Sequence, residues 1–368
     1  MKIQQVETLR AAVPLHTPFK TALRTVTVAE TIVVKITDQD GNTGWGEAPP
    51  THVITGDSLQ SVDYAIHHVF KPLIVGESIL HRERLFEKVD GSMVGNTSAK
   101  AAVDMALHDL AAQSAGMPLV NFLGGHGQTV ETDYTVSVNT PEEMAEDAGK
   151  YTANGFSILK IKVGKDEIAT DIERIQAIRR EIGPDVVIRL DANQGWSPKE
   201  AVKAINKMEE LGLDIELIEQ PVKAHDIAGL KYVTEHTDSL IMADESVFSP
   251  RDAMRVLAER AADLINIKLM KAGGIHHALK IAKLADVHGV ECMVGSMIET
   301  EIGITAAAHF AASQPNITRY DFDAPLMLEG NLVEDGSLVY KGSMIDLGER
   351  SGLGIRRLAD RYVSMEKV

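Results

Sequence analysis

Charged residues that could act together in acid–base or metal chemistry recur along this chain at similar intervals. Lys160 and Lys162 lie two residues apart in an apolar run, so both ammonium groups point to one face of a predicted strand. Further charged residues each end a later apolar run: Asp191, Glu219, Asp244 and Lys268. Successive members are about 25 to 30 residues apart, the length of one strand-plus-helix unit. We therefore expect them to converge at one end of a barrel.

The three acids suit a hard divalent cation. Their donors are carboxylate oxygens without His or Cys partners, a set that favours Mg²⁺ over Zn²⁺. Each acid ends an apolar run, where an unpaired carboxylate is costly to bury. We therefore predict a Mg²⁺ site at Asp191, Glu219 and Asp244. The alternative is three separate structural acids.

The lysines suit a pair of bases. Burial and a nearby cation both lower a lysine pKa, so Lys162 and Lys268 are predicted general bases. Lys160 is predicted to hold a substrate carboxylate oxygen. On the second and sixth barrel strands, the two bases would lie on opposite faces of a planar enediolate. Removing a proton from one face and returning it to the other would racemise or epimerise a carbon. The alternative is three lysines that extend from their strands to solvent.

Composition excludes several other classes. The 368 residues carry a net charge of −16, which argues against nucleic acid and anionic membranes as partners. A single cysteine, Cys292, excludes an internal disulfide and fits a reducing compartment. No stretch has the length of a membrane span, and the first ten residues lack the apolar core of a signal peptide. We expect a cytoplasmic protein.

From about residue 131, apolar runs alternate with amphipathic segments, which predicts a parallel sheet closed into a barrel. The predicted strands are 131–138, 157–163, 186–192, 215–220, 240–244, 264–269, 291–296 and 316–321. The predicted helices are 141–153, 166–181, 198–211, 226–236, 250–260, 274–288 and 301–313. Cap-then-proline pairs such as Ser197-Pro198 and Ser249-Pro250 mark helix starts.

The beginning of the chain has a different pattern. Strands are predicted over 2–13 and 29–38, and helices near 58–73, 80–91 and 97–115. We therefore expect an α+β capping domain over 1–125, a barrel domain over 126–324, and a C-terminal segment, 325–368, that packs back on the cap.

The motif Lys160-Ile161-Lys162, followed by Asp191, Glu219, Asp244 and Lys268, resembles the muconate-lactonising subgroup of the enolase superfamily. Within it, the chain looks closest to the dipeptide epimerases. Supporting stretches are 18–25, 265–271, Gly44-Trp45-Gly46-Glu47 and Asp321-Phe322-Asp323. The resemblance implies an α/β fold: a modified TIM barrel of seven β/α units plus a final strand, with the α+β cap. It also implies a Mg²⁺-dependent isomerase.

The resemblance further implies the substrate contacts. Asp321 and Asp323 alternate with Phe322, so both face the site, and a pair of carboxylates attracts a cation such as a peptide α-ammonium. Arg24 is expected to bind a second-residue carboxylate. The resemblance implies substrate contact for Thr135, Ser296 and Ile298. The segment Val53–Asp57 is either a mobile lid or an ordinary loop.

The expected activity is therefore epimerisation of L-Ala-D/L-Glu and related dipeptides, with a role in peptidoglycan degradation. We expect a small dipeptide as partner and a homo-oligomeric assembly. The enzymatic alternatives are a cycloisomerase, an o-succinylbenzoate synthase and an N-acylamino-acid racemase of the same superfamily. The non-enzymatic alternative is a metal-binding scaffold.

Overall fold

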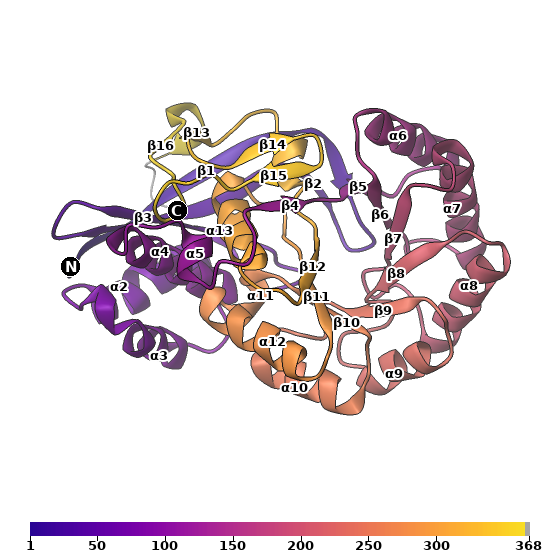
Figure 1. The fold of residues 1–368 in the computed structure, drawn as a ribbon, viewed down its shortest axis with the longest axis horizontal. Coiled ribbons are helices and arrows are strands. Elements are labelled where there is room, and N and C mark those ends of the chain that lie inside the picture. Colours follow the sequence, from indigo (N-terminus) through magenta and orange to yellow (C-terminus); the bar gives the residue numbers. More distant parts are fainter. Residues whose placement is uncertain (365–368) are drawn as a thin grey trace.

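The computed structural model describes residues 1–364. It has two large parts: a cap of sheet and helices at the left of Figure 1, and an α/β barrel at the right. Within the described residues, no helix is both long and apolar enough to cross a membrane. The α/β fold with an N-terminal α+β cap agrees with the expected fold class.

The cap is built on an antiparallel sheet in the order β17-β1-β2-β3. Its strands are β1 (Ile3–Lys20), β2 (Thr25–Asp38), β3 (Thr43–Ala48) and β17 (Val363–Ser364). Alternate residues of β2 face opposite sides, as the two-residue repeat of a strand requires. Ile32, Val34 and Ile36 pack into the cap core, whereas Val33 packs into the larger core shared with the barrel.

Helices cover one face of this sheet. They are α1 (Leu59–Tyr64), the π-helix η1 (Ala65–Phe70), α2 (Lys71–Ile74), the 3₁₀ helix η2 (Ile79–His81), α3 (Arg82–Ser92), α4 (Thr97–Ser114) and α5 (Leu119–Phe122). Helix α4 is buried over most of its length and lies against β3. Two glycines allow that approach: a Cβ at Gly44 or Gly46 would lie 2.1 or 1.9 Å from a carbonyl oxygen of α4.

The barrel is an eight-stranded parallel sheet in the order β5 to β12. Its strands are β5 (Tyr134–Val136), β6 (Ile158–Lys162), β7 (Val187–Asp191), β8 (Ile215–Glu219), β9 (Leu240–Ala243), β10 (Leu264–Ile267), β11 (Glu291–Val294) and β12 (Ile317–Tyr320). The backbone N–H of Asp133 donates to Tyr320 O, so the chain just before β5 meets the last strand.

Helices alternate with these strands and lie outside them in Figure 1. They are α6 (Pro141–Ala153), α7 (Ile168–Ile182), α8 (Pro198–Glu210), α9 (Ile227–Glu235), α10 (Pro250–Glu259), α11 (Leu269–Ala272), α12 (Ile275–Val287) and α13 (Glu301–Ala312). Thr140, Ser197 and Ser249 cap α6, α8 and α10 through their hydroxyl groups, each before a proline.

The structure differs from the expected elements in several places; β1, for example, extends to Lys20 rather than to residue 13. The run 131–138 is split: β4 (Thr129–Glu131) belongs to a separate small sheet, and only Tyr134–Val136 joins the barrel. The split falls at buried Thr132 and Asp133, whose side chains bond to other parts of the barrel. In the cap, β3 was not expected as a strand. The short helix α11 was also not expected, because its residues continue the same apolar run as β10.

The C-terminal segment returns toward the cap. It contains η3 (Ala324–Met327), β13 (Val333–Asp335), β14 (Val339–Lys341), β15 (Met344–Asp346), β16 (Arg357–Leu358) and η4 (Asp360–Tyr362). β14 pairs with β15, which in turn pairs with β4, and β17 pairs with β1 through Arg10 and Ser364. Residues 365–368, the end of the predicted C-terminal segment, lie outside the described residues.

Candidate active site

The charged residues of the sequence motif meet at the carboxyl ends of the barrel strands. Lys162, Asp191 and Glu219 end β6, β7 and β8 and are partners in the register of the parallel sheet. Asp244 and Lys268 come directly after β9 and β10. Because parallel strands end at the same edge, residues far apart in sequence come together here.

Lysine ammonium groups lie between the carboxylates. Lys160 Nζ is 2.7 Å from Glu219 Oε2 and 3.4 Å from Asp191 Oδ2. Lys162 Nζ is 2.5 Å from Asp191 Oδ2, and Lys268 Nζ is 2.8 Å from Asp244 Oδ2. All these side chains are buried. The six groups therefore form one desolvated network of alternating charge.

This network shifts the pKa values of its members. Burial lowers the pKa of Lys268, but Asp244 and Glu219 outweigh it, so the net pKa is raised. The lowered pKa expected for Lys268 depends on a cation that offsets those carboxylates. Burial and the neighbouring Asp191 raise the pKa of Glu219. The buried carboxylates thus repel one another, and a bound cation would reduce that repulsion.

The donor set fits a hard divalent cation. Asp191, Glu219 and Asp244 offer only carboxylate oxygens, and all three are fully buried. Glu219 Oε2 and Asp244 Oδ1 have no hydrogen-bond partner and are balanced only by the ion pairs with Lys160 and Lys271. A cation held here would draw the carboxylates closer together, because lysines now separate them.

Sequence reasoning missed several groups that support these acids. Asn266 Nδ2 donates to Glu219 Oε1 at 2.7 Å, and Gln220 Oε1 accepts from the backbone of Asp244 at 2.9 Å. Buried Lys271 donates to backbone carbonyls beside Asp244 and pairs with its carboxylate at 2.6 Å. Asn266 could have been found, because it lies two residues before Lys268 and therefore on the same strand face.

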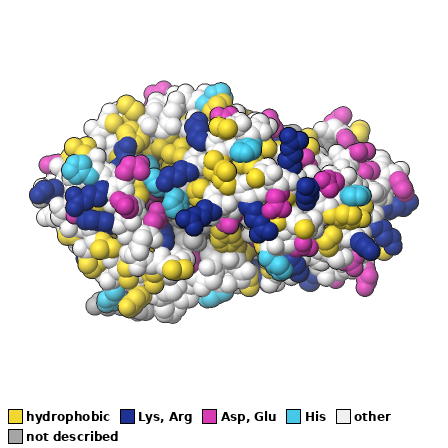
Figure 2. Space-filling view, turned by 90° about the horizontal axis from the view of Figure 1, so that it is seen from below, with side chains coloured by type: hydrophobic (Ala, Val, Ile, Leu, Met, Phe, Trp, Pro, Cys, Tyr) yellow, Lys and Arg dark blue, Asp and Glu magenta, His cyan; other side chains and the backbone are white. Residues whose placement is uncertain are grey.

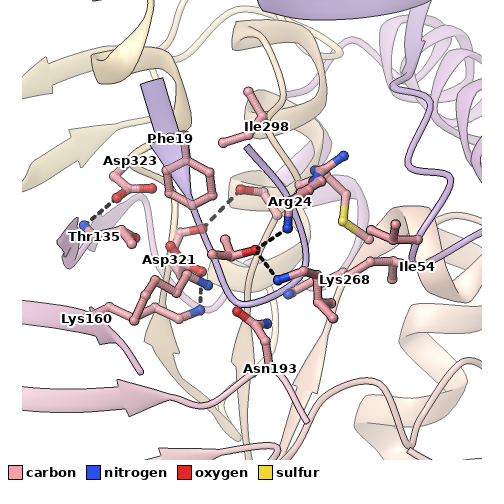
Figure 3. A pocket seen from close by; sticks show the side chains of 16 residues that line it. Phe19, Arg24, Ile54, Thr135, Lys160, Asn193, Lys268, Ile298, Asp321 and Asp323 are labelled. Atoms are coloured by element: carbon pink, nitrogen blue, oxygen red, sulfur yellow. Dashed lines mark hydrogen bonds and ion pairs between the residues drawn. The ribbon is translucent and has the colours of Figure 1, made fainter. Parts of the chain in front are cut away.

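At one side of the pocket lie the two expected ammonium-binding acids (Figure 3). Asp321 Oδ2 accepts from Lys160 Nζ at 2.8 Å, and Asp323 Oδ2 accepts from the backbone N–H of Thr135 at 2.6 Å. No lysine, arginine or histidine in residues 1–364 pairs with Asp323. Burial and neighbouring Asp321 raise the pKa of Asp323 to about 7. A cationic ligand beside it would favour its charged form.

At the other side of the pocket lie Arg24, Ile54 and Ile298 (Figure 3). Burial lowers the pKa of Arg24, and no carboxylate in the described part of the chain pairs with its guanidinium group. Phe19, on β1, lies with its ring centroid 5.8 Å from Lys162 Nζ. The pocket is lined by Phe19, Thr21, Leu23, Arg24, Val53, Ile54, Thr135, Lys160, Lys162, Asn193, Lys268, Ser296, Met297, Ile298, Asp321 and Asp323.

The pocket therefore contains every residue expected to bind substrate or move protons, together with lining residues that were not expected, such as Asn193 and Met297. Val53 and Ile54, from the candidate lid, also line it.

The cap holds the loop that carries Ile298. Buried Glu47, on β3, accepts from the backbone and hydroxyl of Thr300 at 2.9 and 2.7 Å and from the backbone of Gly303. Glu299 Oε1 accepts from the backbone of Met297 at 2.8 Å. Burial and neighbouring Glu47 raise the pKa of Glu299 to about 8. The position of this pocket wall therefore depends on a contact between the two domains.

The chain matches two family models. Residues 143–360 match the enolase C-terminal domain-like family, and residues 3–124 match the N-terminal domain of the mandelate racemase / muconate lactonizing enzyme family. The chain therefore belongs to the mandelate racemase and muconate lactonizing enzyme group of the enolase superfamily, as the motif indicated.

Comparison with individual relatives indicates a narrower class than the family models do. The L-Ala-D/L-Glu epimerase of Bacillus subtilis (strain 168) is 65% identical over 329 residues, which cover 89% of this chain and 90% of that protein. A solved substrate-liganded complex of the L-Ala-D/L-Glu epimerase from Bacillus subtilis has a TM-score of 0.97 and 62% identity, covering 98% of this chain and 100% of that chain. The dipeptide epimerase from Enterococcus faecalis V583, solved with Mg and L-Leu-L-Tyr, has a TM-score of 0.94 and 44% identity, covering 97% and 100%.

Proposed function

We propose that this protein is a dipeptide epimerase that acts on L-Ala-D/L-Glu and inverts the α-carbon of the second residue. The observation that carries the proposal is the placement of Lys162 and Lys268 in one pocket, at the ends of the second and sixth strands of an eight-stranded barrel. The similarity to dipeptide epimerases along the whole chain supports it.

The metal ion in this proposal is Mg²⁺, which the relative from Enterococcus faecalis holds in its structure. Asp191, Glu219 and Asp244 would bind it, because these three buried carboxylates lie at the ends of neighbouring strands and each is paired with a lysine. When bound, the ion would supply positive charge near the substrate carboxylate, which makes the α-proton more acidic.

The lysines carry the proton transfer. A neutral Lys162 or Lys268 takes the α-proton on Nζ, and the electron pair of the C–H bond moves into the carboxylate group. The opposite lysine, as an ammonium, then returns a proton to the other face of the carbon. Buried Lys160 stays positively charged, since Asp321, Glu219 and Asp191 raise its pKa against the effect of burial. It would hold a carboxylate oxygen of the substrate.

The two ends of the pocket orient the dipeptide. Asp323, without a cationic partner in residues 1–364, and Asp321 would receive the α-ammonium group, with Thr135 holding Asp323 in place. Arg24 would bind the glutamate carboxylate, beside the apolar walls of Ile54 and Ile298. Ser296 lines the same pocket and donates to Asp321 O at 3.4 Å.

The test is α-proton exchange in heavy water with Mg²⁺. The parent protein should interconvert L-Ala-L-Glu and L-Ala-D-Glu with deuterium incorporation. Lys162→Ala and Lys268→Ala should each abolish interconversion, while each keeps exchange of the one epimer whose hydrogen faces the remaining lysine. Lys165→Ala, an exposed lysine just beyond β6, is the matched control. Parent-rate interconversion by Lys268→Ala would contradict the two-base mechanism.

N-acylamino-acid racemisation is the second candidate, because the same lysines and acids would serve it. The charge of the substrate amine distinguishes dipeptide epimerisation from N-acylamino-acid racemisation. Acetylation removes the ammonium charge and leaves buried Asp323 without a cationic partner, whereas Asp321 keeps its pairing with Lys160. N-acetyl-L-Ala-L-Glu should therefore lose roughly 30-fold or more in kcat/KM, equivalent to about 2 kcal/mol. Preference for the acetylated substrate would favour the racemase. A role in peptidoglycan degradation remains a prediction from the sequence.

A further inference from the structure

A second cluster of metal-ligand residues lies far from the pocket in sequence, where the cap meets the barrel. Asp90 is near the end of α3 in the cap, and His276 and His277 begin α12 of the barrel. Within residues 1–364, these form the group of His, Cys, Asp or Glu residues whose ligand atoms all lie within 4.8 Å of one another. The face of the molecule that carries α3 and α12 shows histidines interspersed with basic side chains (Figure 2).

His277 is oriented as a metal-ligating histidine is. Its Nδ1 lies 3.1 Å from Ala272 O, and a carbonyl only accepts, so Nδ1 carries the hydrogen. Its Nε2 lies 3.0 Å from Asp90 Oδ2, and because a carboxylate oxygen also accepts, these two atoms share a proton that a metal ion could replace. A backbone carbonyl that fixes one ring nitrogen, leaving the other for a metal, is the usual support for a histidine ligand.

His276 also presents a nitrogen that can bind a metal ion. Its Nε2 lies 2.6 Å from Lys280 Nζ, and an ammonium only donates, so Nε2 is the unprotonated nitrogen. The ring is held against Phe86, with 4.6 Å between centroids. Lys280 is exposed and free to turn into solvent.

Glu83, from the first turn of α3, supports this tautomer: its Oε1 lies 3.7 Å from His276 Nδ1, the nitrogen that carries the hydrogen. Its side chain is 86% exposed, so a change of rotamer could also bring its carboxylate toward the cluster. The cluster thus combines two imidazoles and a carboxylate, with a second carboxylate beside them. This set favours a borderline transition ion such as Zn²⁺, whereas the oxygen-only set in the barrel favours Mg²⁺.

We propose that Asp90, His276 and His277 form a second metal site, which takes Zn²⁺ or a similar transition ion and links the cap to the barrel. One nitrogen from each histidine and one oxygen of Asp90 are the protein ligands, and Glu83 or water completes the shell. The bound ion replaces the proton that His277 Nε2 shares with Asp90. The site is independent of the proposed epimerisation, since none of its residues lines the pocket.

The test uses Zn²⁺ as the probe on the full-length protein. The protein is stripped with chelator and then saturated with Mg²⁺, so that the barrel carboxylates are occupied. Zn²⁺ binding is then measured by calorimetry, and Co²⁺ in its place gives a visible spectrum that reports imidazole ligation. We expect one Zn²⁺ per chain and a rise in Tm of at least about 2 °C, because the ion binds across two domains of the folded state.

Variants decide whether these residues hold the ion. His277→Ala and Asp90→Asn should each weaken Zn²⁺ binding by at least about tenfold and abolish the rise in Tm. His288→Ala, at the other end of α12, is the matched control and should bind as the parent does. If His277→Ala does not fold, His276→Gln replaces it, with the melting curve in Mg²⁺ alone as the check. Absence of stoichiometric binding, or equal binding by the variants, would overturn the proposal and leave His277 and Asp90 as an ordinary ion pair.

Discussion

Arg24 differs from most arginines of the structure because it is partly buried in a pocket wall without a carboxylate partner in residues 1–364. A guanidinium group in that state loses hydration and gains nothing in return unless a ligand supplies an anion. Its neighbours Ile54 and Ile298 are apolar, so the same wall would accept an uncharged side chain with little change. In the proposed function, selectivity for glutamate would therefore depend on this one residue.

Replacing Arg24 by Met should reduce kcat/KM for L-Ala-L-Glu by at least about 30-fold, because a desolvated ion pair loses one partner. A dipeptide with an apolar second residue should change by less than about threefold. Steady-state kinetics with both substrates measure the difference. Arg251→Met, on the exposed side of α10, serves as control. Equal losses on both dipeptides would mean that Arg24 has a structural role.

A separate prediction concerns the three buried acids, Asp191, Glu219 and Asp244. Chelation should abolish turnover and added Mg²⁺ should restore it, because Asp191, Glu219 and Asp244 are buried carboxylates paired with lysines that line the pocket. Asp191→Asn, Glu219→Gln and Asp244→Asn should each weaken Mg²⁺ activation by at least about tenfold. Asp185→Asn, exposed at the opposite end of β7, should behave as the parent does. Full activity after chelation would disprove the metal assignment.

At the scale of elements, the hydrophobic periodicity of the sequence predicted helices and strands well where an element has one environment along its length. The barrel helices lie within two residues of the predicted bounds because Thr140, Ser197 and Ser249 act locally as caps. The strand-end positions of Asp191 and Glu219 followed from their apolar runs. Local pattern failed where tertiary contacts decide. β3 has two glycines, and its pairing with β2 and its packing on α4 are tertiary contacts; the Asp90, His276 and His277 cluster has no characteristic spacing.

The packing of β3 on α4 can be tested directly. Gly46→Ala should lower the free energy of unfolding by at least about 1–3 kcal/mol, because a Cβ there would lie 1.9 Å from Ala102 O and neither backbone can easily move. Gly91→Ala, on α3, has no atom within 4 Å of its Cβ and should be neutral or slightly stabilising. Denaturant unfolding compares the two. A neutral Gly46→Ala would show that the cap sheet and α4 separate at little cost.

At the scale of the molecule, the two domains contribute different residues to the pocket and its surroundings. Barrel strands carry the proposed bases and metal ligands, while Phe19, Arg24 and Val53 reach the pocket from the cap. The domain interface includes buried His309, on α13, whose Nδ1 accepts from the backbone of Val120 on α5 at 3.0 Å. Burial lowers the pKa of His309 from 6.5 to about 3. The interface therefore requires a neutral imidazole.

This gives a pH prediction with a definite sign. Below about pH 6.5 the unfolded chain protonates this histidine, whereas the folded chain does not until about pH 3. Folding stability attributable to His309 is therefore complete above pH 6.5 and falls by about 1.4 kcal/mol per pH unit below it. His309→Asn keeps an acceptor but does not titrate. Unfolding curves at pH 7, 6 and 5 should show a shallower loss in the variant, and equal slopes would contradict the assignment.

The pairing of β17 with β1 has a consequence for biosynthesis. The first and last described strands are neighbours in one sheet. In the sequence, the barrel therefore lies between two cap segments, one that contains β1 and a short one that contains β17. The nascent β1 leaves the ribosome long before its partner β17 has been translated. The barrel can therefore fold while that edge of the cap is still open, and β17 joins the cap sheet only after the whole barrel has been translated.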